Sequence, residues 1–276
     1  MKLRVLFFLV LILSGALPAN AVEQGACSRF APLTFGILPF VSARQLVMRF
    51  TPLANYLTDS LNAEIRIETA PDFVEFARRT HEQQRYDILF TAPHFYPRAS
   101  EAGYRLIVSV DSPGMWAVIV VPKQSSIKKL DDLRGKRLAI LPEKSLASLL
   151  LRKYLREQGI LPDKDLELVI TPTHDASLLS SYHGVTDASA LMQPPFAAAS
   201  SRVRESMRVI ARTERAPHIP ISVSSRISDD CAREISGLLL AMPSTAQGRT
   251  VLEHNRFSGF RKATAQEYEN ISKLMR

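Results

Sequence analysis

The sequence predicts an α/β protein of two lobes, each a mainly parallel sheet flanked by helices, with two crossover strands joining the lobes. Short apolar runs alternate with amphipathic helical segments along the whole chain. Runs such as "YDILFT" (86–91) lack polar alternation, which indicates strands buried on both faces of a parallel sheet. No Gly/Ser-rich linker separates the two parts, so the chain must pass between lobes within strands.

The first half of the chain begins with a strand and a helix. The apolar run "LTFGIL" (33–38) predicts a strand that ends at Pro39. The segment 43–61 places its apolar residues at helical spacing and predicts a helix with a kink or restart at Pro52. A strand, a helix and a second strand are then expected at "AEIRIET" (63–69), "PDFVEFARRT" (71–80) and "YDILFT".

The alternation continues through the second half of the chain. The segment "SLASLLLRKYLREQG" (145–159) predicts a helix with Ser145 at the cap position and Gly159 at its end. A further helix is expected at "HDASLLSSYHG" (174–184), and the chain is expected to be helical from Asp229 onward. Strands are expected at "RLIVSV" (105–110), "WAVIVV" (116–121), "KRLAIL" (136–141), "LELVI" (166–170), "DASAL" (187–191) and "ISVSS" (221–225).

The crossings between lobes are expected in the segments flanking Val121–Ser125 and Pro217–Val223. Residues 22–120 and 221–276 then form the first lobe, and residues 121–220 form the second. Two lobes joined in this way make a clamshell, whose cleft lies where strands end and helices begin.

The N-terminus carries the features of a secretory signal peptide, expected to span residues 1–21. Two basic residues precede an apolar run from Val5 to Leu13, which is too short to cross a bilayer, and "ANA" (19–21) follows. Cleavage is expected before Val22. The chain is therefore expected to be exported, which makes the periplasm its expected location.

Composition and charge restrict the function classes. The chain is 46% hydrophobic and 22% charged, has a formal charge of +8, and is long enough for a sizeable core. The basic residues are scattered, which is compatible with anionic small molecules as partners and makes nucleic acid an unexpected one. The enzyme motifs Gly-x-Ser-x-Gly and His-Glu-x-x-His, the phosphate loop and the dinucleotide glycine run do not occur, so no catalysis is expected.

The two cysteines leave two interpretations open. In an oxidising compartment Cys27 and Cys231 can form a disulfide. Alternatively, Cys27 is a lipid-attachment site, although Gln24 stands where such motifs need an aliphatic residue. Two lone cysteines and six dispersed histidines give none of the spacings of a metal site, so neither a metal nor a cofactor is expected.

Several motifs, taken in order, resemble one family. The chain opens with "FGILPF" (35–40) and "FTPLANYL" (50–57), followed by "YDILFTAPHFY" (86–96). The middle contains "SIKKLDDLRGKRLAIL" (126–141) and "THDASLLSSYHGVTDASA" (173–190), and the end contains "GFRKATAQEYENISKL" (259–274). Together they resemble the phosphate/phosphite/phosphonate periplasmic binding proteins of ABC transporters over nearly the whole mature chain.

The resemblance implies a type 2 periplasmic-binding fold and a function in ligand capture. The expected activity is binding of a small oxyanion, of the phosphate, phosphite or phosphonate kind, by a monomer that delivers it to an ABC permease. Two alternatives remain. The chain could be an accessory protein that presents its ligand to a membrane sensor kinase, or it could bind a less polar ligand, such as a sulfonate or a thiamine precursor.

The resemblance also implies candidate ligand residues in the second lobe. Members hold the anion against a helix start, beside a Ser-Thr-Ser group and a histidine, which Ser145 and His174 match. Leu146 and Ala147 replace the other two hydroxyl residues. Two lost neutral hydrogen bonds at roughly 1 kcal/mol each weaken binding by about thirtyfold. The backbone N–H groups of the helix start still offer an anion site.

Two further positions differ from the family pattern. Phe40 stands where well-known members have a tyrosine, and it remains a candidate ligand contact without the hydroxyl. Ile219 occupies the place of an acid that meets the amine in aminophosphonate binders, so an aminoalkylphosphonate is not expected.

The end of the strand at "YDILFT" supplies the remaining candidates. Ligands of open α/β sheets lie where parallel strands end, so Thr91, Ala92 and His94 are expected to face the cleft with free N–H groups and the Thr91 hydroxyl. Phe95 and Tyr96 either line the cleft or pack in the core of the first lobe.

Overall fold

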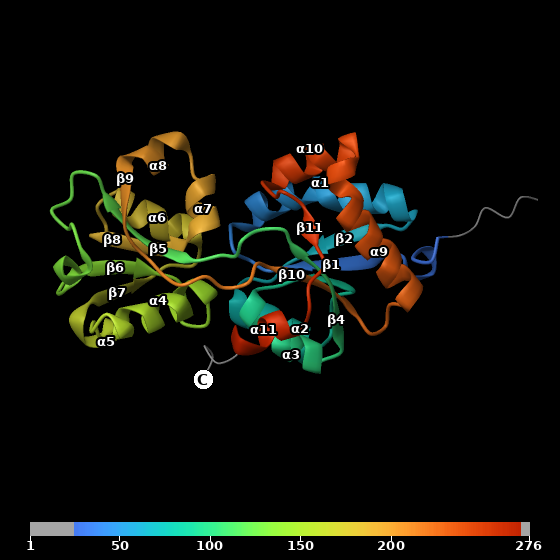
Figure 1. Ribbon diagram of the computed structural model, residues 1–276, viewed down its shortest axis with the longest axis horizontal. Coiled ribbons are helices and arrows are strands. Elements are labelled where there is room, and N and C mark those ends of the chain that lie inside the picture. Colours follow the sequence, from blue (N-terminus) through green and yellow to red (C-terminus); the bar gives the residue numbers. More distant parts are fainter. Residues whose placement is uncertain (1–24, 272–276) are drawn as a thin grey trace, which may run out of the picture.

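The computed structural model describes residues 25–271 as two lobes, each a sheet with helices on both faces (Figure 1). The expected α/β architecture is therefore confirmed, although both sheets are mixed rather than all parallel. Within residues 25–271, no helix has the length and apolarity to cross a membrane. The predicted signal peptide, residues 1–21, lies outside the described residues and stays a prediction.

The first lobe contains a six-stranded sheet in the order β11-β4-β10-β3-β1-β2. Strand β1 pairs in parallel with β2 and β3, and β10 runs antiparallel to both β3 and β4. The strands are β1 (Leu33–Ile37), β2 (Ile65–Glu68), β3 (Ile88–Phe90), β4 (Tyr104–Val110), β10 (Pro220–Ser224) and β11 (Phe260–Arg261). The short β11 lies within the C-terminal region that the sequence predicts to be helical.

Helices cover both faces of this sheet (Figure 1). One face carries α1 (Ala43–Leu61), α9 (Asp229–Ala241) and α10 (Ala246–Asn255). The other carries α2 (Phe73–His81), α3 (Tyr96–Glu101) and α11 (Gln266–Glu269). Short 3-10 turns occur at η1 (Ser28–Phe30), η2 (Pro93–Phe95) and η4 (Met242–Ser244).

The second lobe contains a five-stranded sheet in the order β7-β6-β8-β5-β9. Strand β6 is parallel to β7 and β8, and β5 is antiparallel to β8 and β9. The strands are β5 (Ala117–Pro122), β6 (Arg137–Ile140), β7 (Glu167–Ile170), β8 (Ala188–Met192) and β9 (Met207–Arg212). The helical elements are η3 (Leu130–Leu133), α4 (Leu146–Glu157), α5 (Pro162–Asp165), α6 (His174–Tyr182), α7 (Gln193–Ala198) and α8 (Ser201–Ser206).

The chain crosses between the sheets at 111–116 and 213–219. The expected first crossing at Val121–Ser125 comes too late, because β5 already belongs to the second sheet. The two crossings touch where Met115 and Ala216 exchange backbone hydrogen bonds of 2.8 and 2.7 Å. A Cβ at Gly114, whose φ is +108°, would lie 2.7 Å from the Ala216 carbonyl oxygen, so this approach requires glycine.

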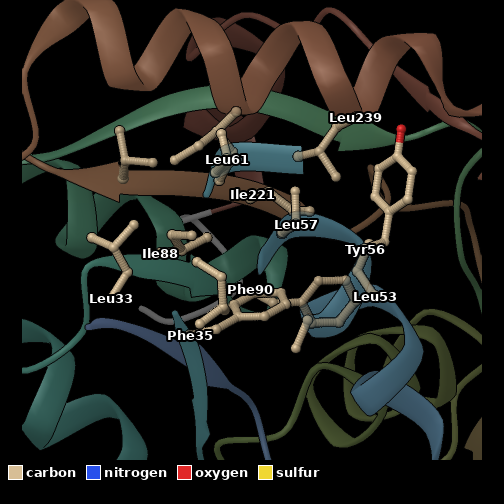
Figure 2. Packing of buried hydrophobic residues seen from close by; sticks show 14 of the residues in the cluster. Leu33, Phe35, Leu53, Tyr56, Leu57, Leu61, Ile88, Phe90, Ile221 and Leu239 are labelled. Carbon is tan, nitrogen blue, oxygen red and sulfur yellow. The ribbon is translucent and has the colours of Figure 1, made fainter. Parts of the chain in front are cut away.

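The apolar core of the first lobe lies between α1 and the sheet (Figure 2). Leu53 and Leu57 of α1 are buried against the strands that carry Phe35 and Phe90. The helix continues through Pro52, which lacks the N–H that would bond the Met48 carbonyl. His254 Nε2 donates to that carbonyl oxygen at 3.0 Å, which compensates for the lost bond and permits an uninterrupted helix.

A disulfide joins Cys27, just before β1, to Cys231 of α9, with Cα atoms 4.7 Å apart. The sequence leaves open whether Cys27 forms a disulfide or carries a lipid, and the structure shows the disulfide. In this pairing Cys27 has no free thiol for a lipid. The bond fastens the segment that leads into the first strand onto the outer helix layer of the first lobe.

Candidate functional site

A cavity of about 410 Å³ lies between the two lobes. Its lining combines both lobes with both crossing segments, as the clamshell arrangement predicts. Much of the lining is apolar, from Leu38, Phe73, Phe90, Val110, Met115 and Met192. The volume falls in the range of small-molecule sites, which are concave, largely apolar and equipped with a few polar groups.

The start of α4 forms one side of the cavity. Ser145 is the N-cap, and its Oγ accepts a hydrogen bond from Ser148 N at 3.2 Å. Leu146 and Ala147, the first two helical residues, line the cavity, and N–H groups at these positions have no acceptor inside a helix. The Ser148 hydroxyl donates to Leu141 O at 2.6 Å, so it does not replace the two missing hydroxyls.

The start of α6 lies beside it and contributes His174. Thr173 caps this helix, and its hydroxyl oxygen accepts a hydrogen bond from Ala176 N at 3.1 Å. His174 Nδ1 accepts from Met192 N at 3.4 Å, which leaves the ring proton on Nε2. Burial lowers the pKa of His174 to about 3, so the ring is a neutral donor. We call Ser145, Leu146, Ala147 and His174 the second-lobe wall.

The predicted first-lobe residues separate into two groups. Phe40 and Ala92 line the cavity. Thr91 and His94 do not belong to the lining, although the sequence predicts that they face the cleft. Successive residues of an extended chain point to opposite sides, so the backbone that turns Phe90 and Ala92 to the cavity turns Thr91 away. The Thr91 side chain is fully buried, and its Oγ1 has no hydrogen-bond partner among the described residues.

His94 joins the two lobes instead of lining the cavity. Its Nε2 lies 2.9 Å from the carbonyl oxygen of Lys144, the residue before the α4 cap, and donates to it. Burial lowers the pKa of His94 to about 4, which keeps the ring neutral.

Phe95 and Tyr96 are buried in the apolar cluster beneath the cavity and are absent from its lining, so the core interpretation of these two aromatics holds.

The first lobe also supplies charged residues that the sequence analysis does not identify. Arg49 of α1, Arg256 after α10 and Phe257 line the cavity together with Phe40. We call these four residues the first-lobe wall. Neither arginine lies in a motif, and residues 49 and 256 meet only through the packing of α1 against α10. The position of Arg49 beside the apolar stripe of α1 is the one feature of the sequence that could have indicated its place in the cavity.

His218 of the second crossing also lines the cavity, although no sequence motif marks it as a ligand residue. Its Nδ1 accepts from Ile219 N at 2.8 Å, so Nε2 carries the proton. Burial, with the charges of Arg49 and Arg261, lowers the pKa of His218 to about 4. Among the described residues of the lining, Asp111 is the one carboxylate, and its side chain is exposed. Neutral donors and cations thus dominate the polar part of the cavity.

Comparisons with known proteins agree with this arrangement. Residues 35–268 match the family model described as "ABC transporter, phosphonate, periplasmic substrate-binding protein". The chain is 23% identical to the phosphonates-binding periplasmic protein of Escherichia coli (strain K12), over 93% of this chain and 78% of that protein.

Two solved structures share the fold. A binding protein component of an ABC phosphonate transporter from Pseudomonas aeruginosa superimposes with a TM-score of 0.80 at 16% identity, covering 88% of this chain and 85% of that one. A Prochlorococcus marinus (MIT 9301) protein, solved in complex with methylphosphonate, gives a TM-score of 0.78 at 18% identity, covering 88% and 96%. Because the family model matches most of the chain, the protein belongs to the phosphonate family of periplasmic substrate-binding proteins of ABC transporters and is a binding protein, not an enzyme.

Proposed function

We propose that the protein captures an organic phosphonate, or a closely related oxyanion with an apolar body, and delivers it to an ABC permease. The oxyanion rests on the second-lobe wall, against the N–H groups of Leu146 and Ala147, with the Ser145 hydroxyl and His174 Nε2 beside it. The observation that carries the proposal is the meeting of two helix starts, those of α4 and α6, on one side of a cavity between lobes. Helix starts offer unpaired amides and the positive end of the dipole to an anion.

The apolar lining supports an organic phosphonate over bare phosphate or phosphite. A water molecule takes about 30 Å³ in the liquid, so a cavity of about 410 Å³ has room for much more than one oxyanion group. The loss of two hydroxyl residues at Leu146 and Ala147 lowers the hydrogen-bonding capacity of the wall. Burial of an apolar substituent against Phe73 and Met192 offsets that loss.

A thermal-shift series on the mature chain tests the proposal. The panel contains phosphate, phosphite, methylphosphonate, ethylphosphonate, sulfate, arsenate and an alkylsulfonate. A ligand at one hundred times its Kd stabilises the folded state by about 2.7 kcal/mol, which raises the melting midpoint measurably. We expect the alkylphosphonates to raise it most. If every oxyanion in the panel leaves the midpoint unchanged, the proposal fails.

The substitution His174→Ala tests the position of the oxyanion. Removing a hydrogen bond to a charged group is expected to weaken ethylphosphonate binding by roughly ten- to a hundredfold, as measured by calorimetry. The control is His81→Ala, which removes a half-buried histidine that does not line the cavity. Equal losses in both variants would contradict the proposed site.

The transport role rests on the family, and its alternative is presentation of the ligand to a sensor kinase. Adjacent genes separate the two: a permease and an ATPase support uptake, and a histidine kinase supports sensing.

A further inference from the structure

Arg49 places a guanidinium in the cavity without an acidic partner. Within residues 25–271, it has no carboxylate at ion-pair distance, and its hydrogen bond goes to the Asn255 carbonyl oxygen, 2.5 Å from Nη2. Its Nε is buried and has no partner among the described residues. The Arg49 residue is half-buried, and a charge that is partly removed from water normally has a counter-ion, because desolvation is costly. The missing counter-ion therefore points to a ligand.

The surroundings of Arg49 are aromatic. Its guanidinium carbon lies 5.5 Å from the ring centroids of Phe40 and Phe257 and 5.9 Å from that of Phe50. Cation–π attraction stabilises the charge in this position, but rings offer no acceptor for its remaining N–H donors. The rings fix the orientation of the guanidinium and leave its hydrogen-bonding capacity for another molecule.

A second cation increases the demand for an anion. Burial and the charge of Arg256 lower the pKa of Arg49 to about 10, so the two guanidinium groups are close enough to repel. Arg256 also reaches the second lobe, with Nη1 3.4 Å from the Ala197 carbonyl oxygen. Asp111, the carboxylate among the described lining residues, is exposed and does not contribute to the shift of Arg49. An anionic group between the lobes would relieve the repulsion.

We propose that Arg49, supported by Arg256, binds a carboxylate at the far end of the ligand, and that the ligand class is a phosphonocarboxylate. This inference rests on the proposed function, in which the second-lobe wall holds the phosphonate. The guanidinium fork matches the two oxygens of a carboxylate. The apolar lining between the walls fits the carbon chain that joins the two acidic groups. An aminoalkylphosphonate would instead bring its ammonium group to two cations.

Three ligands that share a two-carbon unit on phosphorus test the inference by calorimetry on the mature chain: 3-phosphonopropionate, ethylphosphonate and 2-aminoethylphosphonate. We expect 3-phosphonopropionate to bind roughly ten- to a hundredfold more tightly than ethylphosphonate, the gain typical of a charge-assisted hydrogen-bond pair. We expect 2-aminoethylphosphonate to bind most weakly. If ethylphosphonate binds and the carboxylated ligand has no advantage, this inference fails while the proposed function stands. If none of the three binds, the proposed function fails first.

Variants of Arg49 locate the carboxylate. Arg49→Met keeps a long apolar side chain and is expected to abolish the advantage of 3-phosphonopropionate, so that its Kd and that of ethylphosphonate come within threefold of each other. Arg49→Lys keeps the charge without the fork, and is expected to retain part of the advantage. Arg44→Met removes a charge from the same helix, outside the cavity lining, and is the matched control.

The outcome that overturns this assignment is an equal loss of both ligands in Arg49→Met. Such a loss would show that Arg49 supports the fold or holds the phosphonate itself. Melting midpoints of the unliganded variants identify the first case, because a misfolded variant melts early while Arg44→Met does not. A normal midpoint with an equal loss identifies the second case.

Discussion

The two walls of the cavity present polar groups by different means. The second-lobe wall consists of neutral donors, namely backbone amides at the start of α4, the Ser145 hydroxyl and a neutral His174. The first-lobe wall carries formal charge, on Arg49 and Arg256, set among aromatic rings. One wall follows from local helix structure, and the other from packing between segments two hundred residues apart in the sequence.

This difference has an energetic consequence. Free N–H groups at a helix start are a general feature of helices, so an empty second-lobe wall costs the protein little. A half-buried guanidinium such as that of Arg49, partly desolvated and without a counter-ion, costs more. We therefore expect the second-lobe wall to supply affinity for oxyanions in general. The first-lobe wall is expected to select, among ligands that carry an oxyanion, those with a second anionic group.

Acidification tests whether the buried histidines, among them His174 of the second-lobe wall, are uncharged. The pKa of His174 is lowered to about 3 and those of His94 and His218 to about 4, all chiefly by burial, against an ordinary value of about 6.5. The unfolded chain then takes up protons below pH 6.5 while the folded chain does not, so stability falls as pH decreases from about 6.5 toward 4. Between pH 7 and pH 5 we expect a loss of roughly 2 kcal/mol for each histidine, measured by urea unfolding.

His174→Gln and His94→Gln serve as the comparison for this experiment. Each variant should lose about a third of the acid sensitivity, since His174, His94 and His218 are the three histidines whose pKa values are lowered furthest. Carboxyl groups titrate near pH 4 and below, so they contribute little in this window. An unfolding free energy that stays constant from pH 7 to pH 5 would mean that these rings take up protons in the folded protein as readily as in the unfolded chain, so that burial does not keep His174 neutral.

A carboxylate on the second-lobe wall should have the next largest effect. Ala147→Asp puts a negative charge at the start of α4, where the helix dipole favours it, so the helix should remain intact. The same charge repels a bound oxyanion, at about 4 kcal/mol for 4 Å in partly buried surroundings. We expect calorimetry to show at least a hundredfold loss for ethylphosphonate and 3-phosphonopropionate alike, unlike the selective effect of Arg49→Met.

Ala147→Asn is the matched control, because it has nearly the same shape without the charge. If the aspartate and asparagine variants bind ethylphosphonate within a factor of three of each other, the oxyanion does not lie on the second-lobe wall.

Restoring a hydroxyl should give the smallest effect. Leu146→Ser adds a donor at the helix start, and a neutral hydrogen bond contributes about 1 kcal/mol, so we expect roughly fivefold tighter binding of methylphosphonate than in Leu146→Ala. Both variants lose the same apolar side chain, which makes their difference a measure of the hydroxyl alone. Equal Kd values in the two variants would place the oxyanion elsewhere along α4.

The sequence predicts the fold largely because its signals are local. The apolar stripe of α1, the Ser145 cap and the buried strand β3 all depend on neighbours within a few residues. The short β11 and the strand β9 are harder to find, since they are defined by the strands beside them. The first crossing is misplaced for the same reason, because pairing partners alone decide the sheet to which β5 belongs.

The candidate site shows the same dependence on contacts between residues distant in the sequence. The family resemblance of the sequence points to Ser145 and His174, and both line the cavity. The strand-end rule also selects Thr91 and His94, but the alternation of an extended segment turns Thr91 away, and the turn at Pro93 brings His94 to Lys144. Arg49 becomes part of a site only because Asn255 and Phe257 fold back onto α1. No local pattern encodes that contact.

The bond between Cys27 and Cys231 encloses the entire second lobe in one covalent loop. A protease that cuts once in any exposed turn between these residues therefore produces two fragments that stay linked until a reductant is added. Both crossings to the second lobe lie inside this ring. A single nick in the periplasm would leave the molecule joined, with the two halves of the cavity still tethered to each other.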